Sequence, residues 1–266
     1  MFWTQWRYGE NIALLIEEVE TQIAPIHRSI DERVDGNQYR VLDSFRRHQV
    51  SDGHFIPSTG YGYDDVGRDT LDRIYADVFG AEAGLVRPQI ISGTHAIAIA
   101  LFGVLRPGDE LLYITGAPYD TLEEIVGTRG SGVGSLKEFG IRYRSVPLTA
   151  DGAVDFPAVR EAMNERTKMI GIQRSRGYAT RPSFTVDEIA EMIAFVKAIK
   201  PDVVVFVDNC YGEFVEEKEP CHVGADLMAG SLIKNPGGGL AKTGGYIVGK
   251  QTYVDACACR MTSPGI

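Results

Sequence analysis

The sequence is poor in the features that mark several classes of protein. It holds 4 cysteines in 266 residues (Cys210, Cys221, Cys257 and Cys259), and none of them forms a C-x-x-C pair. This usage argues against a structural zinc site and a disulfide scaffold, and it fits a reducing compartment. No apolar run approaches the roughly 18 residues of a membrane-spanning helix, and the first residues contain no apolar signal core. We therefore expect a soluble, cytoplasmic protein with no bound metal and no membrane partner.

Positive charge is also scarce. Lys and Arg total 27 against 36 Asp and Glu, which gives a formal net charge of −9, and there is no basic tract. Because nucleic-acid binding depends on phosphate neutralisation by clustered Lys and Arg, a nucleic-acid partner is not expected. Hydrophobic residues make up 44% of the chain and charged residues 24%, as in an ordinary globular protein of one large or two small domains.

Apolar periodicity predicts helices and strands that alternate along most of the chain. Helical spacing predicts a helix over residues 8–30, disturbed near Pro25, and residues 46–68 are predicted to be an exposed ordered loop. The remaining predicted helices cover residues 70–79, 94–105, 119–126, 155–163 and 186–199, and the predicted strands cover residues 85–91, 110–115, 141–146, 168–173 and 203–207.

Two of these strands carry information about their place in the sheet. Pro88 argues for an edge strand or a bulge, whereas the continuous apolar run at residues 203–207 is typical of a strand buried on both faces of a parallel sheet. The alternation of strands and helices predicts an α/β fold, a mostly parallel sheet with helices on both faces and right-handed crossovers.

The ends of the predicted strands carry the candidate functional residues, because open α/β sheets bind ligands at the carboxyl ends of their strands. Ser92, Gly93 and Thr94 connect a strand to a helix. They form either an anion site of free backbone N–H groups or a simple helix cap. Asp208 follows five apolar residues and needs either a cationic ligand or a structural partner.

Two further side chains extend this set. Lys234 follows an apolar run and precedes a glycine-rich loop, and it is either a desolvated, imine-forming nucleophile or an ordinary edge lysine. Tyr119 follows another strand and either covers a planar ligand or sits at the rim of the core. Rival motifs fail: Pro236 and Ala241 stand where a P-loop needs glycine, and the chain has no G-x-S-x-G elbow and no histidine spacing for a metal.

The ordered set resembles the fold-type I pyridoxal 5′-phosphate enzymes. Within them it is similar to the cystathionine and methionine lyase group, and especially to the branch called aluminium resistance protein or methionine gamma-lyase family protein. The resemblance runs from about residue 8 to the last residue, and it is carried by residues 60–69, 87–96, 207–214 and 230–239. It implies a carbon–sulfur lyase of sulfur amino-acid metabolism.

The resemblance implies roles for three of the side chains. Lys234 would hold pyridoxal 5′-phosphate covalently and then act as the base at the substrate Cα. Asp208 would pair with the pyridinium nitrogen, which makes the ring an electron sink. Tyr119 would stack on the ring.

The resemblance also implies how the cofactor phosphate is held. Ser92, Gly93 and Thr94 would bind it at the start of a helix, with help from the hydroxyl of Ser231. Tyr61 of a neighbouring subunit would reach the same phosphate, so a homodimer or homotetramer with shared active sites is expected.

Several positions depart from the pattern of the group. Tyr63 stands where an Arg is usual, which leaves Arg68 as a substitute, and Ile233 replaces a hydroxyl residue before the lysine. Arg174 and Arg176 replace an acidic-Pro-Asn segment, and they either bind a substrate carboxylate or form surface salt bridges.

Length is the largest departure. Enzymes of this type continue past the lysine into a smaller C-terminal domain that supplies the arginine for the substrate α-carboxylate. We therefore expect a truncated chain with an N-terminal helical segment at residues 1–50 and a large cofactor-binding domain at residues 51–266. The alternatives to a lyase are another reaction of the same cofactor, such as transamination, and a non-catalytic, partial cofactor-binding domain.

Overall fold

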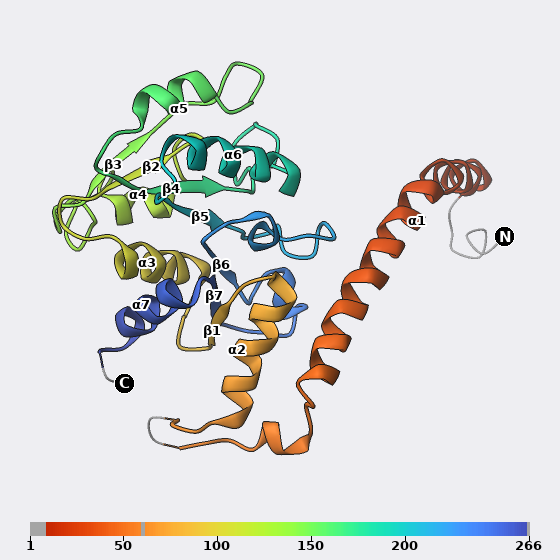
Figure 1. Ribbon diagram of the computed structural model, residues 1–266. Coiled ribbons are helices and arrows are strands. Elements are labelled where there is room, and N and C mark those ends of the chain that lie inside the picture. The colour runs from red at the N-terminus through yellow and green to blue at the C-terminus, as the bar shows by residue number, and fades with distance from the viewer. Residues whose placement is uncertain (1–8, 60–61, 265–266) are drawn as a thin grey trace.

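A seven-stranded sheet forms the centre of the part of the chain that the computed structural model describes, residues 9–59 and 62–264 (Figure 1). The strands are β1 (Ala83–Arg87), β2 (Glu110–Tyr113), β3 (Arg142–Ser145), β4 (Thr167–Gln173), β5 (Val204–Asp208), β6 (Leu227–Ser231) and β7 (Gly245–Gly249). Their order is β1-β7-β6-β5-β4-β2-β3. Neighbours from β6 to β3 run parallel, and β7 runs antiparallel to both β1 and β6. The predicted mostly parallel sheet is confirmed.

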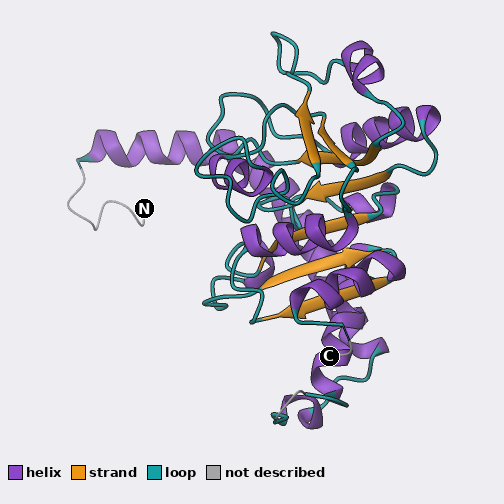
Figure 2. Cartoon of the chain, turned by 90° about the vertical axis from the view of Figure 1, so that its left-hand side faces the viewer, coloured by secondary structure: helices purple, strands orange, loops and turns teal. Residues whose placement is uncertain are grey.

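Helices cover both faces of this sheet (Figure 2). These helices are α2 (Val66–Phe79), α3 (Gly93–Val104), α4 (Asp120–Val126), α5 (Phe156–Ala162), α6 (Val186–Ile199) and α7 (Gln251–Met261). Helix α1 (Glu10–Arg47) packs against α2 and stands beside the sheet (Figure 1). Short 3-10 segments are η2 (Asp52–Phe55), η3 (Pro220–Val223) and η4 (Asn235–Gly237). One buried apolar cluster joins α3, α4 and α7 to the sheet through Phe206. The other joins α2, α5 and α6 to it through Val205 and Val207. Because side chains alternate along a strand, β5 contributes side chains to both clusters, and all five of its residues are buried.

Helix α1 differs most from its prediction. It continues through Pro25 to Arg47 instead of ending near residue 30. Tertiary contacts stabilise its second half, since the Asn37 amide donates to the Phe214 carbonyl over 2.9 Å and the Ser44 hydroxyl donates to Asp77 over 2.6 Å. The helix changes direction in its first half (Figures 1 and 2), and proline inside a helix is a common cause of such a bend.

The other differences are smaller. The predicted loop at residues 46–68 is shortened at both ends by α1 and α2, and it contains η2. Strand β1 ends before Pro88 and lies at the sheet edge, as that proline predicts. Strands β6 and β7 and helix α7 lie outside the predicted elements, although the apolar run noted before Lys234 overlaps β6. No helix within the described residues is both long and apolar enough to cross a membrane.

Candidate functional site

The candidate residues meet at the carboxyl ends of the central parallel strands. Gln173 of β4 pairs with Asp208 of β5, which pairs with Ala229 of β6, so the ends of the three strands lie side by side. A cavity of about 640 Å³ opens at this edge. Its lining comprises Ser92, Gly93, Thr94, Tyr119, Asp120, Thr121, Gln173, Ser175, Arg176, Gly177, Tyr178, Ser183, Asp208, Cys210, Tyr211, Ser231, Ile233 and Lys234.

The start of α3 forms one wall of the cavity. Ser92 caps the helix, because its hydroxyl accepts a hydrogen bond from the His95 N–H over 3.0 Å. The first N–H groups of a helix have no acceptor within it, so those of Gly93 and Thr94 remain available for an anion. A Cβ on Gly93 would lie 3.0 Å from the Cys210 sulfur and from the Ser231 Cβ, so glycine allows α3 to approach β6 this closely. The predicted helix cap is therefore present with Ser92 as the capping side chain, and among the described residues it leaves the N–H groups of Gly93 and Thr94 unbonded.

Tyr119 stands at the other side of this wall as the first residue before α4. Its hydroxyl is 2.9 Å from the Thr94 hydroxyl, and its backbone N–H donates to the Gln173 amide oxygen over 2.9 Å. Burial, with the nearby charge of Asp208, raises the pKa of the Tyr119 phenol. The residue is thus held at its hydroxyl and at its backbone, and the phenol stays protonated.

Asp208 is 2% exposed at the end of β5. The Cys210 N–H donates to its carboxylate over 3.1 Å. Burial raises the pKa of Asp208 to about 6, although this hydrogen bond and the charge of Lys234 oppose the shift. A cation placed against this carboxylate would relieve the cost of burying its charge.

Lys234 follows β6 and is half-buried in the same cavity. Its ammonium nitrogen lies 3.4 Å from the centre of the Tyr211 ring. Tyr211 itself has a φ of 68°, a left-handed conformation that is unusual for a bulky residue. Lys242, the nearby alternative to Lys234, is exposed and outside the cavity lining.

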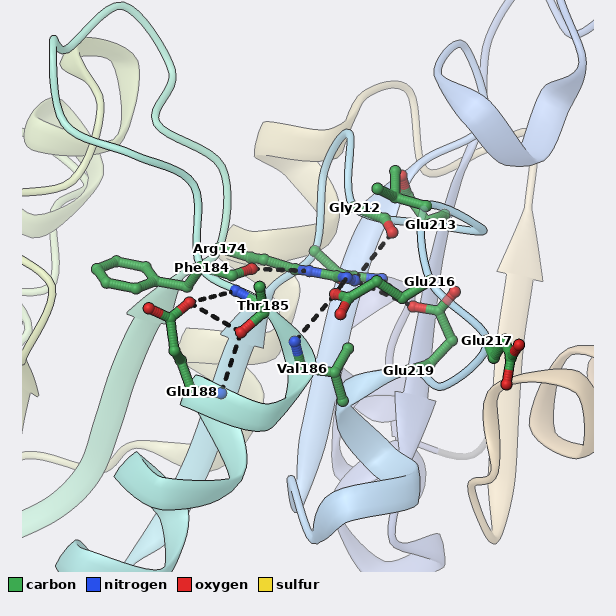
Figure 3. A network of polar contacts seen from close by, with 12 residues as sticks. Arg174, Phe184, Thr185, Val186, Glu188, Gly212, Glu213, Glu216, Glu217 and Glu219 are labelled. Carbon is green, nitrogen blue, oxygen red and sulfur yellow. Dashed lines mark hydrogen bonds and ion pairs between the residues drawn. The ribbon is translucent and has the colours of Figure 1, made fainter. Parts of the chain in front are cut away.

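The two arginines after β4 separate in the structure. Arg174 is 3% exposed and belongs to the buried network of Figure 3. Its guanidinium donates to Asn209 over 2.8 Å and to the Gly212 carbonyl over 2.9 Å, and it pairs with Glu216 and Glu219. The prediction that Arg174 binds a substrate carboxylate or forms a surface salt bridge is therefore wrong. Arg174 is buried and stabilises the turn after Asp208. Arg176 lines the cavity.

Of the residues expected from a neighbouring subunit, Tyr61 falls outside the described residues. The Arg68 guanidinium donates to the Gly62 carbonyl, and its backbone N–H donates to Asp65 at the start of α2. Neither Arg68 nor Tyr63 belongs to the cavity lining.

Three residues of the site were absent from the candidates chosen from the sequence. Cys210 and Tyr211 directly follow the strand-end Asp208, and this position was the signal that pointed to them. Gln173 ends β4 next to Asp208, and its amide links Tyr119 to the Ser175 carbonyl.

A second, larger hollow does not gather the predicted residues. It has a volume of about 1,030 Å³ and lies where β2 and β3 begin, beside the ends of α4 and α5. Arg144, one of its cations, is tied to Glu110 by two hydrogen bonds of 2.9 and 2.8 Å. No group of His, Cys, Asp and Glu within the described residues is arranged to hold a metal ion.

Comparison with known proteins gives close relatives. The family model described as methionine gamma-lyase matches residues 12–266. YnbB of Bacillus subtilis (strain 168) is 71% identical over 260 residues, which are 97% of this chain and 62% of YnbB. A crystal structure of a Bacillus cereus protein has a TM-score of 0.95 and 75% identity, and the match covers 97% of this chain and 63% of that one. The chain thus spans less than two thirds of the length of these relatives.

Other relatives carry functional names. A crystal structure named as a carbon–sulfur lyase involved in aluminium resistance, from Clostridium novyi NT, has a TM-score of 0.93 and 43% identity, covering 100% of this chain and 63% of that one. The L-methionine gamma-lyase of Pseudomonas putida is 29% identical over 199 residues, 74% of this chain and 44% of its own length. The pyridoxal-5′-phosphate-dependent protein YhfS of Escherichia coli, 20% identical with a TM-score of 0.64 over 85% of this chain and 58% of YhfS, shares the fold.

Proposed function

The chain belongs to the methionine gamma-lyase family, and from this premise we propose that it is a carbon–sulfur lyase acting on a sulfur amino acid. The family and its pyridoxal-phosphate-dependent structural neighbours imply pyridoxal 5′-phosphate as the cofactor. The observation that carries the proposal is one cavity lined by a lysine, a buried strand-end carboxylate, an aromatic ring and a helix start with free N–H groups.

The residues of the cavity fit this cofactor. The cradle at Gly93 has no room for a side chain, and its N–H groups, with the Ser231 hydroxyl, suit a phosphate. Asp208 is buried and forms no ion pair among the described residues, where its hydrogen bonds come from Cys210. A protonated pyridine nitrogen would supply that charge, and Tyr119 would lie on the ring.

The chemistry divides between the cofactor and the side chains. The bound cofactor supplies an electron sink for the bonds at the substrate Cα. Lys234 would anchor the cofactor, and its freed amine would take the proton from Cα. The protonated phenol of Tyr119 would donate a hydrogen bond into the cavity, and the carboxylate of Asp208 would keep the ring nitrogen charged.

We extend the proposal to the organisation of the protein. Residues 51–266 would form the cofactor-binding domain, with residues 1–50 as an N-terminal helical segment. Two or four copies would share their active sites. We also propose a cytoplasmic location, because all 4 cysteines are free.

Absorbance and turnover test the proposal together. The purified chain loaded with pyridoxal phosphate should show a visible band that is lost in Lys234→Ala and kept in the control Lys242→Ala. It should then cleave L-methionine or L-cystathionine, with uptake of one water, to a thiol, a keto acid and ammonia. A visible band without turnover would contradict the lyase and support a cofactor-binding domain, and a colourless protein would contradict both.

A further inference from the structure

The loop between β4 and α6 carries three arginines, and the guanidinium groups of two of them are held by hydrogen bonds. Arg174 is part of the buried network of Figure 3. The Arg181 guanidinium donates to the carbonyls of Gln173 and Ser175 over 2.9 and 2.6 Å, and it lies 4.8 Å from the centre of the Phe184 ring. Both side chains therefore stabilise the fold of the loop.

Arg176 is different because only its backbone is fixed. Its N–H donates to the Ser183 hydroxyl over 3.2 Å, and its carbonyl accepts from the Ala179 N–H over 3.0 Å. Gly177 follows with a φ of 57°, which turns the loop at this point. Within residues 9–59 and 62–264, the Arg176 guanidinium has no acidic partner within ion-pair distance.

The other charged groups of the cavity already have a neighbour or a proposed role. Lys234 lies over Tyr211, and Asp208 faces the position proposed for the ring nitrogen. Asp120 is 3.9 Å from Arg129. The proposed phosphate site is built from α3 and β6, whereas Arg176 lies in the loop between β4 and α6. Arg176 is thus a cation on the cavity wall with no assigned anion, and its planar guanidinium matches a carboxylate in two parallel hydrogen bonds.

We propose that Arg176 binds a carboxylate of the amino-acid substrate. The inference rests on the proposed function and deepens it, since it assigns binding of a substrate carboxylate to this loop. The carboxylate has two sources, the α-carboxylate that every amino acid carries and the second carboxylate of a substrate such as cystathionine.

Equilibrium binding to the full chain tests the proposal, with pyridoxal phosphate fixed on Lys234 by borohydride reduction so that the ligands bind without being cleaved. Three ligands are compared: L-methionine, 3-(methylthio)propylamine, which lacks the carboxylate, and L-cystathionine, which has two. Calorimetry measures their dissociation constants for the wild type, Arg176→Gln, Arg176→Lys and the control Arg142→Gln, which removes an exposed arginine on edge strand β3. Binding of pyridoxal phosphate is measured separately for each variant.

The expected result is a loss of affinity confined to carboxylate ligands. If Arg176 binds the α-carboxylate, Arg176→Gln should raise the dissociation constants of methionine and cystathionine about tenfold or more and leave that of the amine unchanged. If Arg176 binds the side-chain carboxylate, only the dissociation constant of cystathionine should rise. In both cases Arg176→Lys should recover part of the loss, because it keeps the charge without the fork, and Arg142→Gln should match the wild type.

Three results would overturn the proposal. Unchanged affinities in Arg176→Gln would show that no carboxylate is bound there. Equal weakening of the amine and the amino acids would indicate a general disturbance of the loop, and a loss confined to pyridoxal phosphate would assign Arg176 to the cofactor. A wild-type protein that takes up the cofactor but none of the three ligands would instead contradict the proposed function.

Discussion

At the scale of single residues, the buried carboxylate of Asp208 sets a pH dependence that is open to measurement. Its pKa is raised to about 6, so between about pH 4 and pH 6 the folded protein keeps a proton that the unfolded chain has lost. The stability of the cofactor-free protein should therefore fall as pH rises through this window. Asp208→Asn should remove that loss. Its free energy of unfolding minus that of the wild type should therefore be about 2–3 kcal/mol larger at pH 8 than at pH 4, as measured by urea unfolding.

Asp226 provides a matched control of opposite sign. It is 1% exposed, and it pairs with Lys197 and Lys250 over 2.7 and 2.6 Å, which lowers its pKa. Its contribution is present at neutral pH and lost as pH falls, so Asp226→Asn should destabilise the protein most at pH 8. The same Asp208→Asn variant should bind pyridoxal phosphate more weakly. Equal pH profiles for the two variants, or unchanged cofactor affinity in Asp208→Asn, would contradict the role of Asp208.

The Tyr211 ring makes a second residue-scale prediction. The Tyr211 ring lies 3.4 Å from the Lys234 ammonium, a cation–π contact that is worth about 0.5–2 kcal/mol. In the cofactor-free protein, Tyr211→Leu should therefore release the amine from this contact and speed acetylation of Lys234 about twofold to thirtyfold. Tyr211→Phe should keep the wild-type rate because it retains the ring. Mass spectrometry of the digest gives the rates, with exposed Lys242 as internal reference. Equal rates in the Leu and Phe variants would contradict the contact.

At the scale of elements, the network of Arg174 connects β4, the turn after β5 and the start of α6 (Figure 3). Glu219 is fully buried, so removal of Arg174 would leave its charge unpaired. We expect Arg174→Met to lower the free energy of unfolding by about 3–5 kcal/mol, whereas Arg142→Gln should change it by under about 0.5 kcal/mol. Urea unfolding measures both, and a stable Arg174→Met variant would show that the network adds little.

Elements with strong local signals could be predicted from the sequence. Helix α6 has the predicted bounds because Thr185 and Glu188 cap it and its apolar face recurs regularly. Strand β5 was identified by its unbroken apolar run. Strand β7 lacked such a signal, since its first and last residues are Gly245 and Gly249 and its antiparallel pairing depends on β1 and β6. Contacts distant in sequence likewise decide how far α1 extends.

The site followed the same division. Lys234, Asp208 and Tyr119 could be identified because parallel strands place their carboxyl ends together. The different environments of Arg174 and Arg176 could not be predicted, because the sequence does not show which of the two arginines pairs with Glu216 and Glu219. The place of Tyr211 after Asp208 was a signal that could have identified it, but its backbone conformation and its contact with Lys234 are not visible in a sequence.

At the scale of the whole molecule, the proposed assembly makes each active site depend on two copies. By resemblance, Tyr61 would complete the phosphate site of a neighbour, and a two-fold axis makes that contact reciprocal. Mixing Tyr61→Ala subunits with Lys234→Ala subunits should produce some sites that carry both residues. Cofactor binding by the mixture should therefore exceed that of either variant alone. A strictly monomeric protein that binds the cofactor tightly would exclude the shared site.

The central claim, that this cavity holds pyridoxal phosphate on Lys234, is tested most directly by borohydride reduction of the cofactor-loaded protein. Reduction makes the attachment permanent, and peptide mapping then identifies the labelled lysine. The account predicts one pyridoxyl label per chain, on Lys234. A label on Lys242, on another lysine or on none would contradict it.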